Sequence, residues 1–152
     1  MVGPGVVKRG TFGEIFSDHT DIRPTILSLV GLKDDYAHDG RVLFEALADH
    51  ATPRALHAHR DTLSALADAY KKINAPLGEL GFTTLTGISI KGSEATYNSL
   101  EAQIKTITKR RNEITAKMIE MLENAAFEDQ PINEAKAVQL IDQAFDLLDS
   151  IP

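Results

Sequence analysis

The feature that most constrains this chain is a long heptad pattern between residues 93 and 127. Apolar residues recur there at alternating steps of three and four, and one arginine interrupts them. The positions are Tyr97, Leu100, Ile104, Ile107, Arg111, Ile114, Met118, Met121 and Ala125. This spacing lines up one side of a helix and predicts a seam that packs against other helices. At 1.5 Å per residue the helix is roughly 50 Å long, so other helices must cover it.

Two further segments carry helical stripes. Residues 53–73 begin at Thr52-Pro53, a cap followed by a proline, and the segment after Pro131 begins at a candidate cap, Asn133. The first stripe is Leu56, His59, Leu63, Leu66, Tyr70 and Ile73, and the second is Val138, Ile141, Phe145 and Leu148. The glycine-rich residues 77–92 are expected to pack along these helices with at most one helical turn or a short extended stretch. The prediction for residues 49–152 is an antiparallel three-helix bundle with long heptad-patterned helices.

The N-terminal third, residues 1–48, has a different pattern. It opens with a glycine-rich loop and a possible short strand at Val6-Val7. A short helix is predicted over residues 21–30, with Thr20 or Asp21 as its cap and Gly31 at its C-terminal end. A second short helix is predicted over residues 42–48. The fold class is therefore mainly α, with a short mixed segment before the bundle.

Charge and composition exclude several classes of function. The net charge is −6, which argues against nucleic acid or an anionic membrane as the main partner. The chain has no cysteine, so disulfides, thiolate chemistry and cysteine-based zinc sites are excluded. The sequence has no apolar run near the length of a membrane span and no signal peptide at its start. A cytoplasmic location is expected if these residues are the complete chain.

Three short segments of the first third resemble the end of a known catalytic domain. They are residues 3–10 (GPGVVKRG), residues 18–32 (DHTDIRPTILSLVGL) and residues 39–43 (DGRVL). Their order and spacing resemble the last part of the alkaline phosphatase, phosphodiesterase and sulfatase superfamily. There, a GPG-V-x-x-G strand and turn precedes a D-x-x-P-T helix and a DG-x-x-L turn. Residues 70–78 (YKKINAPLG) look like a recurrent stretch of helical extensions that follow such domains.

The resemblance implies where the chemistry would lie. In the superfamily the metal ligands and the serine, threonine or formylglycine nucleophile come from upstream segments, and here Asp18-His19 is followed by Thr20 rather than glycine. The implied parent protein is a metal-dependent hydrolase of phosphate or sulfate esters. Residues 1–48 would be the remnant of its α/β domain, and residues 49–152 a helical extension.

The expected function is accordingly a non-catalytic C-terminal structural and interaction module without a cofactor of its own. Its expected partners are the parent catalytic domain, another protein that binds the helical faces, and a second copy of the chain. Neither nucleic acid nor a membrane is expected to bind. The expected interaction residues lie on the long seam: Tyr97, Ile104, Ile107, Arg111, Ile114 and Met118.

Two polar clusters are candidate metal sites. Asp18, His19 and Asp21 could hold a divalent ion with two carboxylates and an imidazole. The competing interpretation is that Asp21 caps a helix and His19 bonds the loop backbone. Asp34, Asp35, His38 and Asp39 lack the ligand spacing of a calcium loop and are interpreted as a solvated turn.

Arg111 supports an alternative function. The favoured interpretation is that this arginine sets the register of the helices. The alternative is an autonomous small helical enzyme or ligand-binding domain, with a pocket between helices near Arg111. The other bases on the long helix, Lys105, Lys109, Arg110 and Lys117, have acidic neighbours and are interpreted as ion-pair partners.

Overall fold

The computed structural model describes residues 3–8, 16–89 and 94–151, and this part of the chain is mainly helical, as predicted. The helices are α1 (Ile22–Leu29), α2 (Arg54–Ala58), α3 (Arg60–Asn74), α4 (Glu79–Ser89), α5 (Glu94–Phe127) and α6 (Glu134–Asp149). Short 3₁₀ turns cover His19–Asp21, Phe44–Ala46 and Asp49–Ala51. Within the described ranges, β pairing is limited to an isolated antiparallel bridge between Val6 and Leu47.

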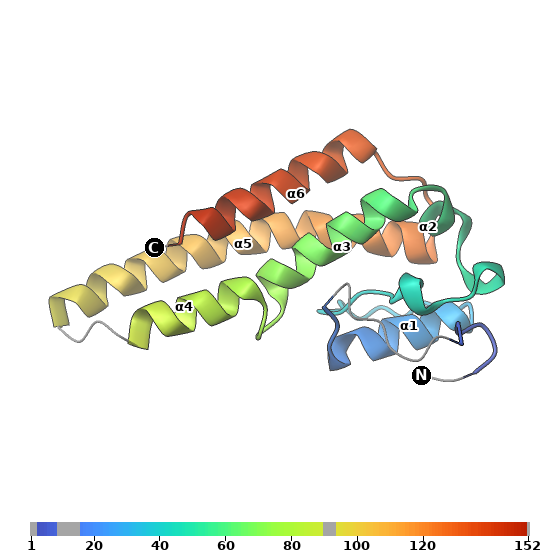
Figure 1. Cartoon of the computed structure of the whole chain (residues 1–152), viewed down its shortest axis with the longest axis horizontal. Helices are drawn as coiled ribbons and strands as arrows, with labels where there is room; N and C mark the ends of the chain where they lie inside the picture. Colours follow the sequence, from blue (N-terminus) through green and yellow to red (C-terminus); the bar gives the residue numbers. More distant parts are fainter. Residues whose placement is uncertain (1–2, 9–15, 90–93, 152) are drawn as a thin grey trace.

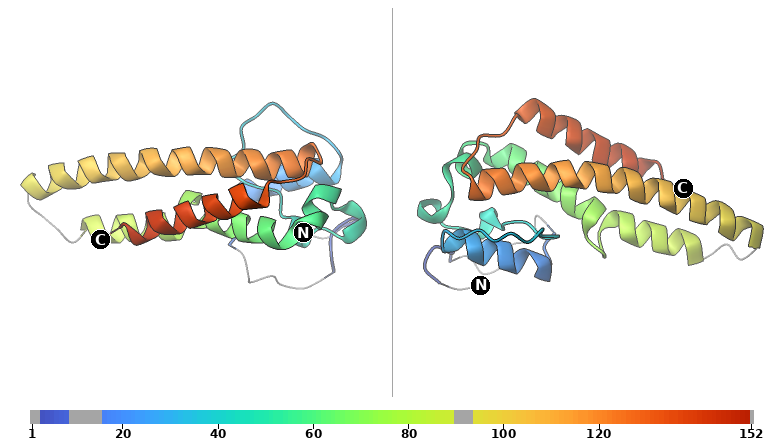
Figure 2. Two further views of the ribbon diagram at one scale, coloured as in Figure 1. Left: turned by 90° about the horizontal axis from the view of Figure 1, so that it is seen from above. Right: turned by 180° about the vertical axis from the view of Figure 1, so that it is seen from behind.

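The three helices α3, α5 and α6 pack on one another, and α5 runs opposite to the other two (Figure 1). The segment that contains α1 lies at one end of the molecule, next to the C-terminal end of α5. At the other end, α5 extends well beyond the C-terminal end of α6, as both views of Figure 2 show. The two ends of the molecule therefore differ in how many helical layers they contain.

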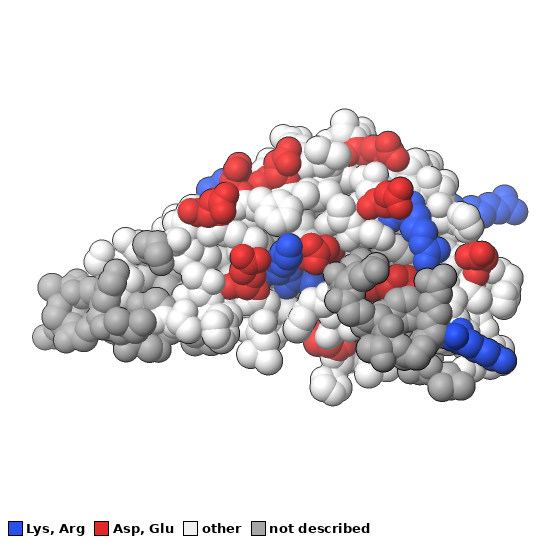
Figure 3. All heavy atoms as spheres, viewed as in Figure 1, with Lys and Arg blue, Asp and Glu red and all other residues white. Residues whose placement is uncertain are grey.

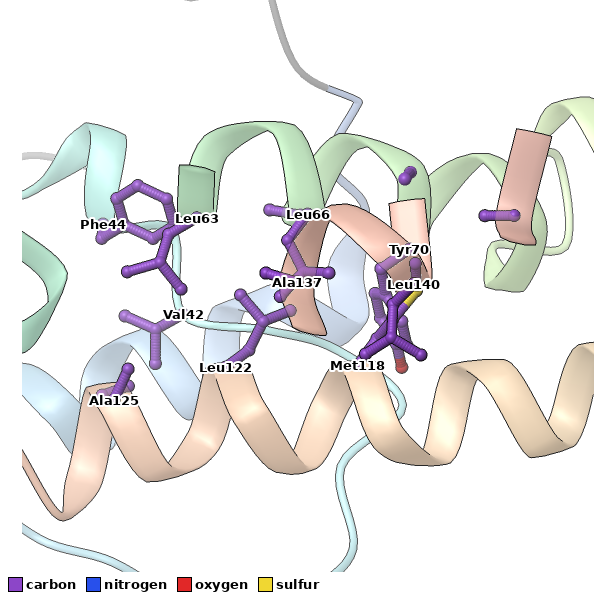
Figure 4. Packing of buried hydrophobic residues seen from close by; sticks show 14 of the residues in the cluster. Val42, Phe44, Leu63, Leu66, Tyr70, Met118, Leu122, Ala125, Ala137 and Leu140 are labelled. Carbon is purple, nitrogen blue, oxygen red and sulfur yellow. The ribbon is translucent and has the colours of Figure 1, made fainter. Parts of the chain in front are cut away.

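Side chains from residues 42–47 and from each of the helices α2 to α6 share one core (Figure 4). The labelled members are Val42, Phe44, Leu63, Leu66, Tyr70, Met118, Leu122, Ala125, Ala137 and Leu140. Phe44 and Leu47 come from the N-terminal third, yet they are as completely buried as Leu63 of α3. The core is therefore continuous across residues 48 and 49, where the sequence suggested a domain boundary.

The predicted helix over residues 53–73 is divided in two. Its backbone leaves the helical conformation at His59, where φ is −121° and ψ is 31°. The apolar stripe is buried as predicted at Leu56, Leu63, Leu66, Tyr70 and Ile73. The placement of His59 on that stripe is wrong, because its ring bonds the Glu134 carboxylate of α6 instead, at 2.9 Å.

Residues 79–89 form an α-helix, which corrects the prediction of at most one turn. The Thr84 hydroxyl is satisfied inside this helix, because it donates to the Leu80 carbonyl at 2.7 Å. The tight turn before α4 requires Gly78, where a Cβ atom would lie 2.6 Å from the Lys71 carbonyl oxygen. Gly78, which in the sequence suggested a loop, therefore allows the tight turn that leads into α4.

The last helix begins as predicted, with Asn133 accepting from the amide of Lys136 at 3.0 Å. Its predicted buried stripe is shifted by one position, although Ile141 and Leu148 of that stripe are partly buried and pack against the core. The buried residues are Ala137, Leu140, Ala144 and Leu147, while Val138 and Phe145 are exposed. Both stripes have the same 3-4-3 spacing, so periodicity alone could not choose between them, and the smaller side chains allow α6 to approach α3 and α5 closely.

The long helix matches its predicted span, and its seam is buried mainly in the C-terminal half. Ile114 and Met118 are buried, whereas Ile104, Ile107 and Arg111 are only partly covered. The side chain of Tyr97 and residue 93, where the predicted pattern begins, lie outside what the structure describes. Asp129, at φ 50°, ends the turn after α5 and accepts from the Ala55 amide at 2.8 Å.

The N-terminal elements are shorter than predicted. A 3₁₀ turn capped by Asp18 precedes α1. Asp21 occupies the predicted N-cap position of α1, but its side chain makes no capping bond to that helix. Gly31 has the predicted left-handed conformation, with φ 67°. Residues 42–48 contain only the 3₁₀ turn at Phe44–Ala46, not a helix. No helix in the described residues is both long and apolar enough to cross a bilayer.

Candidate functional site

A buried lysine joins the N-terminal third to α3. Lys71 Nζ lies 2.7 Å from Asp21 Oδ1 and 3.2 Å from Asp18 Oδ1, and it donates to Thr20 Oγ1 at 3.3 Å. Both Lys71 and Asp21 are almost completely inaccessible to solvent. A buried ion pair that loses one partner leaves an uncompensated charge, which costs about 3–5 kcal/mol. This contact therefore fixes the N-terminal third on the helices.

Asp18 and Asp21 also bind each other's backbone. Asp18 accepts from the Thr20 amide at 2.9 Å, and Asp21 Oδ2 accepts from the Asp18 amide at 2.9 Å, which is a capping box. Burial by itself raises the pKa of Asp18, but hydrogen bonds from Thr20 and the charge of Lys71 outweigh it and lower that pKa. Asp18 is therefore held as a carboxylate.

The same turn supports the segment at residues 40–43. Asp21 Oδ1 accepts from the Arg41 amide at 2.9 Å, and Thr25 Oγ1 accepts from the Leu43 amide at 2.9 Å. Gly40 packs directly on the backbone of Thr20, since a Cβ atom there would lie 2.1 Å from the Thr20 carbonyl oxygen. These bonds join two segments that are about twenty residues apart in sequence.

The first segment of the resemblance contacts this region as well. The Val7 amide donates to the Ala46 carbonyl at 3.0 Å, and the Ala48 amide donates to the Gly5 carbonyl at 2.8 Å. Gly5 has φ 83° and its α-carbon lies against Leu29 of α1. The three segments on which the resemblance rests therefore lie together in space.

Tyr70 and Asn74, on the same turn of α3 as Lys71, extend the contact. Tyr70 Oη donates to the Asp39 carbonyl at 2.8 Å and accepts from Asn74 Nδ2 at 2.8 Å. Burial, together with the carboxylates of Asp39 and Asp21, raises the pKa of Tyr70 far above its usual range. We call the group Asp18, Asp21, Tyr70, Lys71 and Asn74 the Lys71 clamp.

Arg41 is a second buried charge that sequence reasoning missed. Its guanidinium donates to both carboxylate oxygens of Glu45, at 2.8 and 2.6 Å, and to the Val42 carbonyl at 3.1 Å. The signal was present in the sequence as an arginine and a glutamate four residues apart, but neither lies in a regular helix. This pair holds the turn between the clamp and the extended residues Leu47 and Ala48.

The metal hypothesis for Asp18, His19 and Asp21 receives no support in the part of the chain that the structure describes. His19 is exposed, and the ammonium group of Lys71 lies between the two carboxylates. No group of three acidic or histidine side chains among the described residues could hold a metal ion. The positive charge at this position is provided by the protein itself.

The acidic turn at residues 33–39 is not simply solvated, which corrects its interpretation. Asp34 pairs with Arg23 and with His38 Nε2, the latter at 2.8 Å. Burial would raise the pKa of Asp34, but the bonds from His38 and Arg23 lower it overall. Lys33 reaches Glu128, the residue directly after α5, at 2.6 Å, so this loop is attached to the bundle.

The described hydrogen bonds of Arg111 lie within its own helix. Its guanidinium donates to the neighbouring Asn112 Oδ1 at 2.9 and 2.7 Å, and the side chain is partly exposed. A hollow lined by Asn112 is formed by residues of α5 alone, from Ile104 to Ala116. Other seam residues have packing roles, since Ile114 and Met118 belong to the core.

Two surfaces expose apolar side chains in a regular pattern. The outer face of α1 presents Ile22, Ile26 and Val30, which are four residues apart and at least 43% exposed. At the other end, Leu77 and Phe82 near α4 are 76% and 63% exposed. Contiguous apolar patches such as these two are typical of surfaces that contact another protein.

The surface along α6 has a different character, because acidic side chains gather there in the view of Figure 3.

Comparison with known proteins does not assign the chain to a family. It matches no protein-family model, no curated protein and no solved structure.

Proposed function

We propose that this chain is a non-catalytic C-terminal module of a protein that resembles the alkaline phosphatase, phosphodiesterase and sulfatase superfamily. In this proposal, residues 1–48 close an α/β catalytic domain. Residues 49–152 form an antiparallel three-helix bundle that serves structure and interaction. The parent protein would be a metal-dependent hydrolase of phosphate or sulfate esters, and its chemistry would lie upstream.

One observation carries the proposal. Asp21 and Thr25 of the D-x-x-P-T segment bind the backbone amides of Arg41 and Leu43 in the DG-x-x-L segment. Three short matches that were unrelated in space would be weak support. Matches that build one compact turn are stronger support, because each residue type then has a physical role in the same local structure.

The exposed face of α1 is consistent with a missing neighbour. Ile22, Ile26 and Val30 form one stripe of that helix, and nothing in the described residues covers it. A surface helix normally turns such a stripe toward a core. In the proposal, the sheet of the parent domain covers this face, and the Lys71 clamp holds the bundle on the opposite side.

The first test is the coding sequence upstream of Met1. We expect an in-frame continuation that encodes a nucleophile and an Asp-His-Gly metal motif. An in-frame stop codon directly upstream would contradict the proposal, because the 152 residues would then act alone.

The second test measures binding and activity. The chain alone should not hydrolyse p-nitrophenyl phosphate or sulfate. Titrated into the separately produced upstream domain, it should bind, and Ile26→Asp on the α1 face should weaken binding while Val138→Asp on α6 should not. Hydrolysis by the chain alone, or equal effects of the two substitutions, would contradict the proposed arrangement.

A further inference from the structure

The helical layers end at different distances along α5. This helix has 34 residues and α6 has 16, which correspond to lengths of about 51 and 24 Å. The C-terminal end of α6 stops short of the N-terminal end of α5, so the first part of α5 extends past it (Figure 1). We call α4, together with residues 76–78 and residues 94–110 of α5, the distal arm.

The distal arm exposes more apolar surface to solvent than its uncharged, apolar sequence would suggest. From Leu80 to Ser89 the sequence contains no charged residue. A helix without a charged face is normally covered by other elements on more than one side. Phe82 nevertheless exposes 63% of its surface and Leu77 exposes 76%. On α5 the apolar seam continues through the arm, where Leu100, Ile104 and Ile107 are only partly covered.

A pair of helices is half of a well-known stable arrangement. Two helical hairpins that pack face to face form a four-helix bundle, in which each supplies the layers that the other lacks. A two-fold axis allows identical surfaces to meet. If residue i of one copy contacts residue j of the other, residue j of the first copy also contacts residue i of the second. An arm of two helices therefore fits a second identical arm.

The charges favour the same partner. The distal arm carries three acidic and three basic residues, out of 22 and 16 in the whole chain. The rest of the chain is therefore strongly acidic, and two copies that met there would repel each other. Along α5, Glu101 precedes Lys105 and Lys109, so an antiparallel crossing near Gln103 places the acid of one copy opposite a base of the other.

We propose that the distal arm is a self-association surface, on which a second copy of this chain packs antiparallel to give a two-fold dimer with a four-helix contact. Its centre is the first half of α5, and Phe82 of each α4 is buried by the partner copy. This inference does not depend on the identity of the upstream domain, so either proposal can fail without the other.

The test is the mass in solution of the 1–152 chain, measured by light scattering after size exclusion over a range of concentrations. We expect a particle of twice the 16.6 kDa chain. Phe82→Asp should weaken the dimer by roughly tenfold or more. Ile26→Asp and Val138→Asp are matched controls, since both replace apolar residues of similar exposure, 49% and 50%, on α1 and α6. Far-UV circular dichroism establishes that each variant is folded, and Phe82→Lys repeats the test with the opposite charge.

A monomeric wild-type chain at every concentration would overturn the proposal. A dimer that survives both Phe82 substitutions would also overturn it. If Ile26→Asp or Val138→Asp dissociates the dimer instead, the contact lies on α1 or α6 and the assignment to the distal arm is wrong.

Discussion

Lys71 of α3 and Asp21, fifty residues earlier in the chain, form an ion pair of 2.7 Å in which both side chains are buried. Asp21 also accepts from the backbone amides of Asp18 and Arg41. A single carboxylate therefore orders the first turn, supports the residue 40–43 segment and attaches both to the helices. The attachment between the two parts of the chain is consequently an internal contact, not a flexible linker.

Lys71→Met should destabilise the chain strongly. The substitution leaves the Asp21 carboxylate buried without its cation, so we expect a loss of about 3 kcal/mol or more in the free energy of unfolding, measured by urea denaturation. Lys72→Met is the control, because Lys72 pairs with Asp68 near the surface at 3.1 Å and should cost below about 1 kcal/mol. Equal losses of unfolding free energy for the two substitutions would show that the buried ion pair stabilises the chain no more than the surface ion pair does.

Gly40→Ala should be among the most damaging small substitutions. The new methyl group would lie 2.1 Å from the Thr20 carbonyl oxygen, and that backbone is fixed by the clamp. We expect a loss of about 3 kcal/mol from overpacking, seen as a lower midpoint of thermal unfolding. Gly3→Ala is the matched control, because nothing lies within 4 Å of its added Cβ atom. A stable Gly40→Ala variant would mean that the turn has room to move.

The register of α6 can be tested with two truncations. Leu140→Ala removes a buried side chain and should cost about 2–5 kcal/mol. Val138→Ala removes an exposed one and should change stability by less than about 0.5 kcal/mol. If Val138→Ala proves the more costly, the heptad stripe expected from the sequence is the buried one after all.

Glu123→Gln should stabilise the chain at neutral pH. Burial raises the pKa of Glu123, and the nearby charges of His38 and Lys33 only partly oppose this. An acid whose pKa is raised by folding loses stability as the pH rises through that pKa, so the carboxylate is unfavourable at pH 7. Because the group is partly solvated, we expect a gain below about 1 kcal/mol.

This gain has a specific pH dependence. It should be present at pH 7 and vanish below about pH 4, where the glutamate is protonated in both the folded and unfolded states. Unfolding curves of the wild type and the variant at both pH values check it. A gain that persists in acid would point to a packing effect rather than to ionisation.

Much of the architecture could be predicted from periodicity. The sequence predicted the spans of α5 and α6, the cap at Asn133 and the buried stripe of α3, because each depends on residues close in sequence. The left-handed backbone conformation of Gly31 could be predicted for the same reason. Helix formation is a local property, and spacing of three and four residues reports it directly.

The clamp could not be predicted in this way. Lys71 lies next to Tyr70 on an ordinary amphipathic helix, and nothing in the local sequence distinguishes it from the half-buried Lys72. Its partner lies fifty residues away, and the burial of both depends on how the N-terminal third folds over α3. Asp21 looked like a helix cap for the same reason: its role as a counter-ion exists only in the assembled chain.

The sequence by itself determined the spans of α5 and α6 and the buried stripe of α3, because these depend on residues that are close in sequence. Only the tertiary structure decided which of two equally spaced stripes on α6 is buried, since small residues allow closer helix contact than Val138 and Phe145 would. It also decided that residues 79–89 form a helix, and that residues 18–25 and 40–43 meet around Asp21. Local spacing fixes the direction in which side chains point, but contacts between distant segments determine which of those directions face the core.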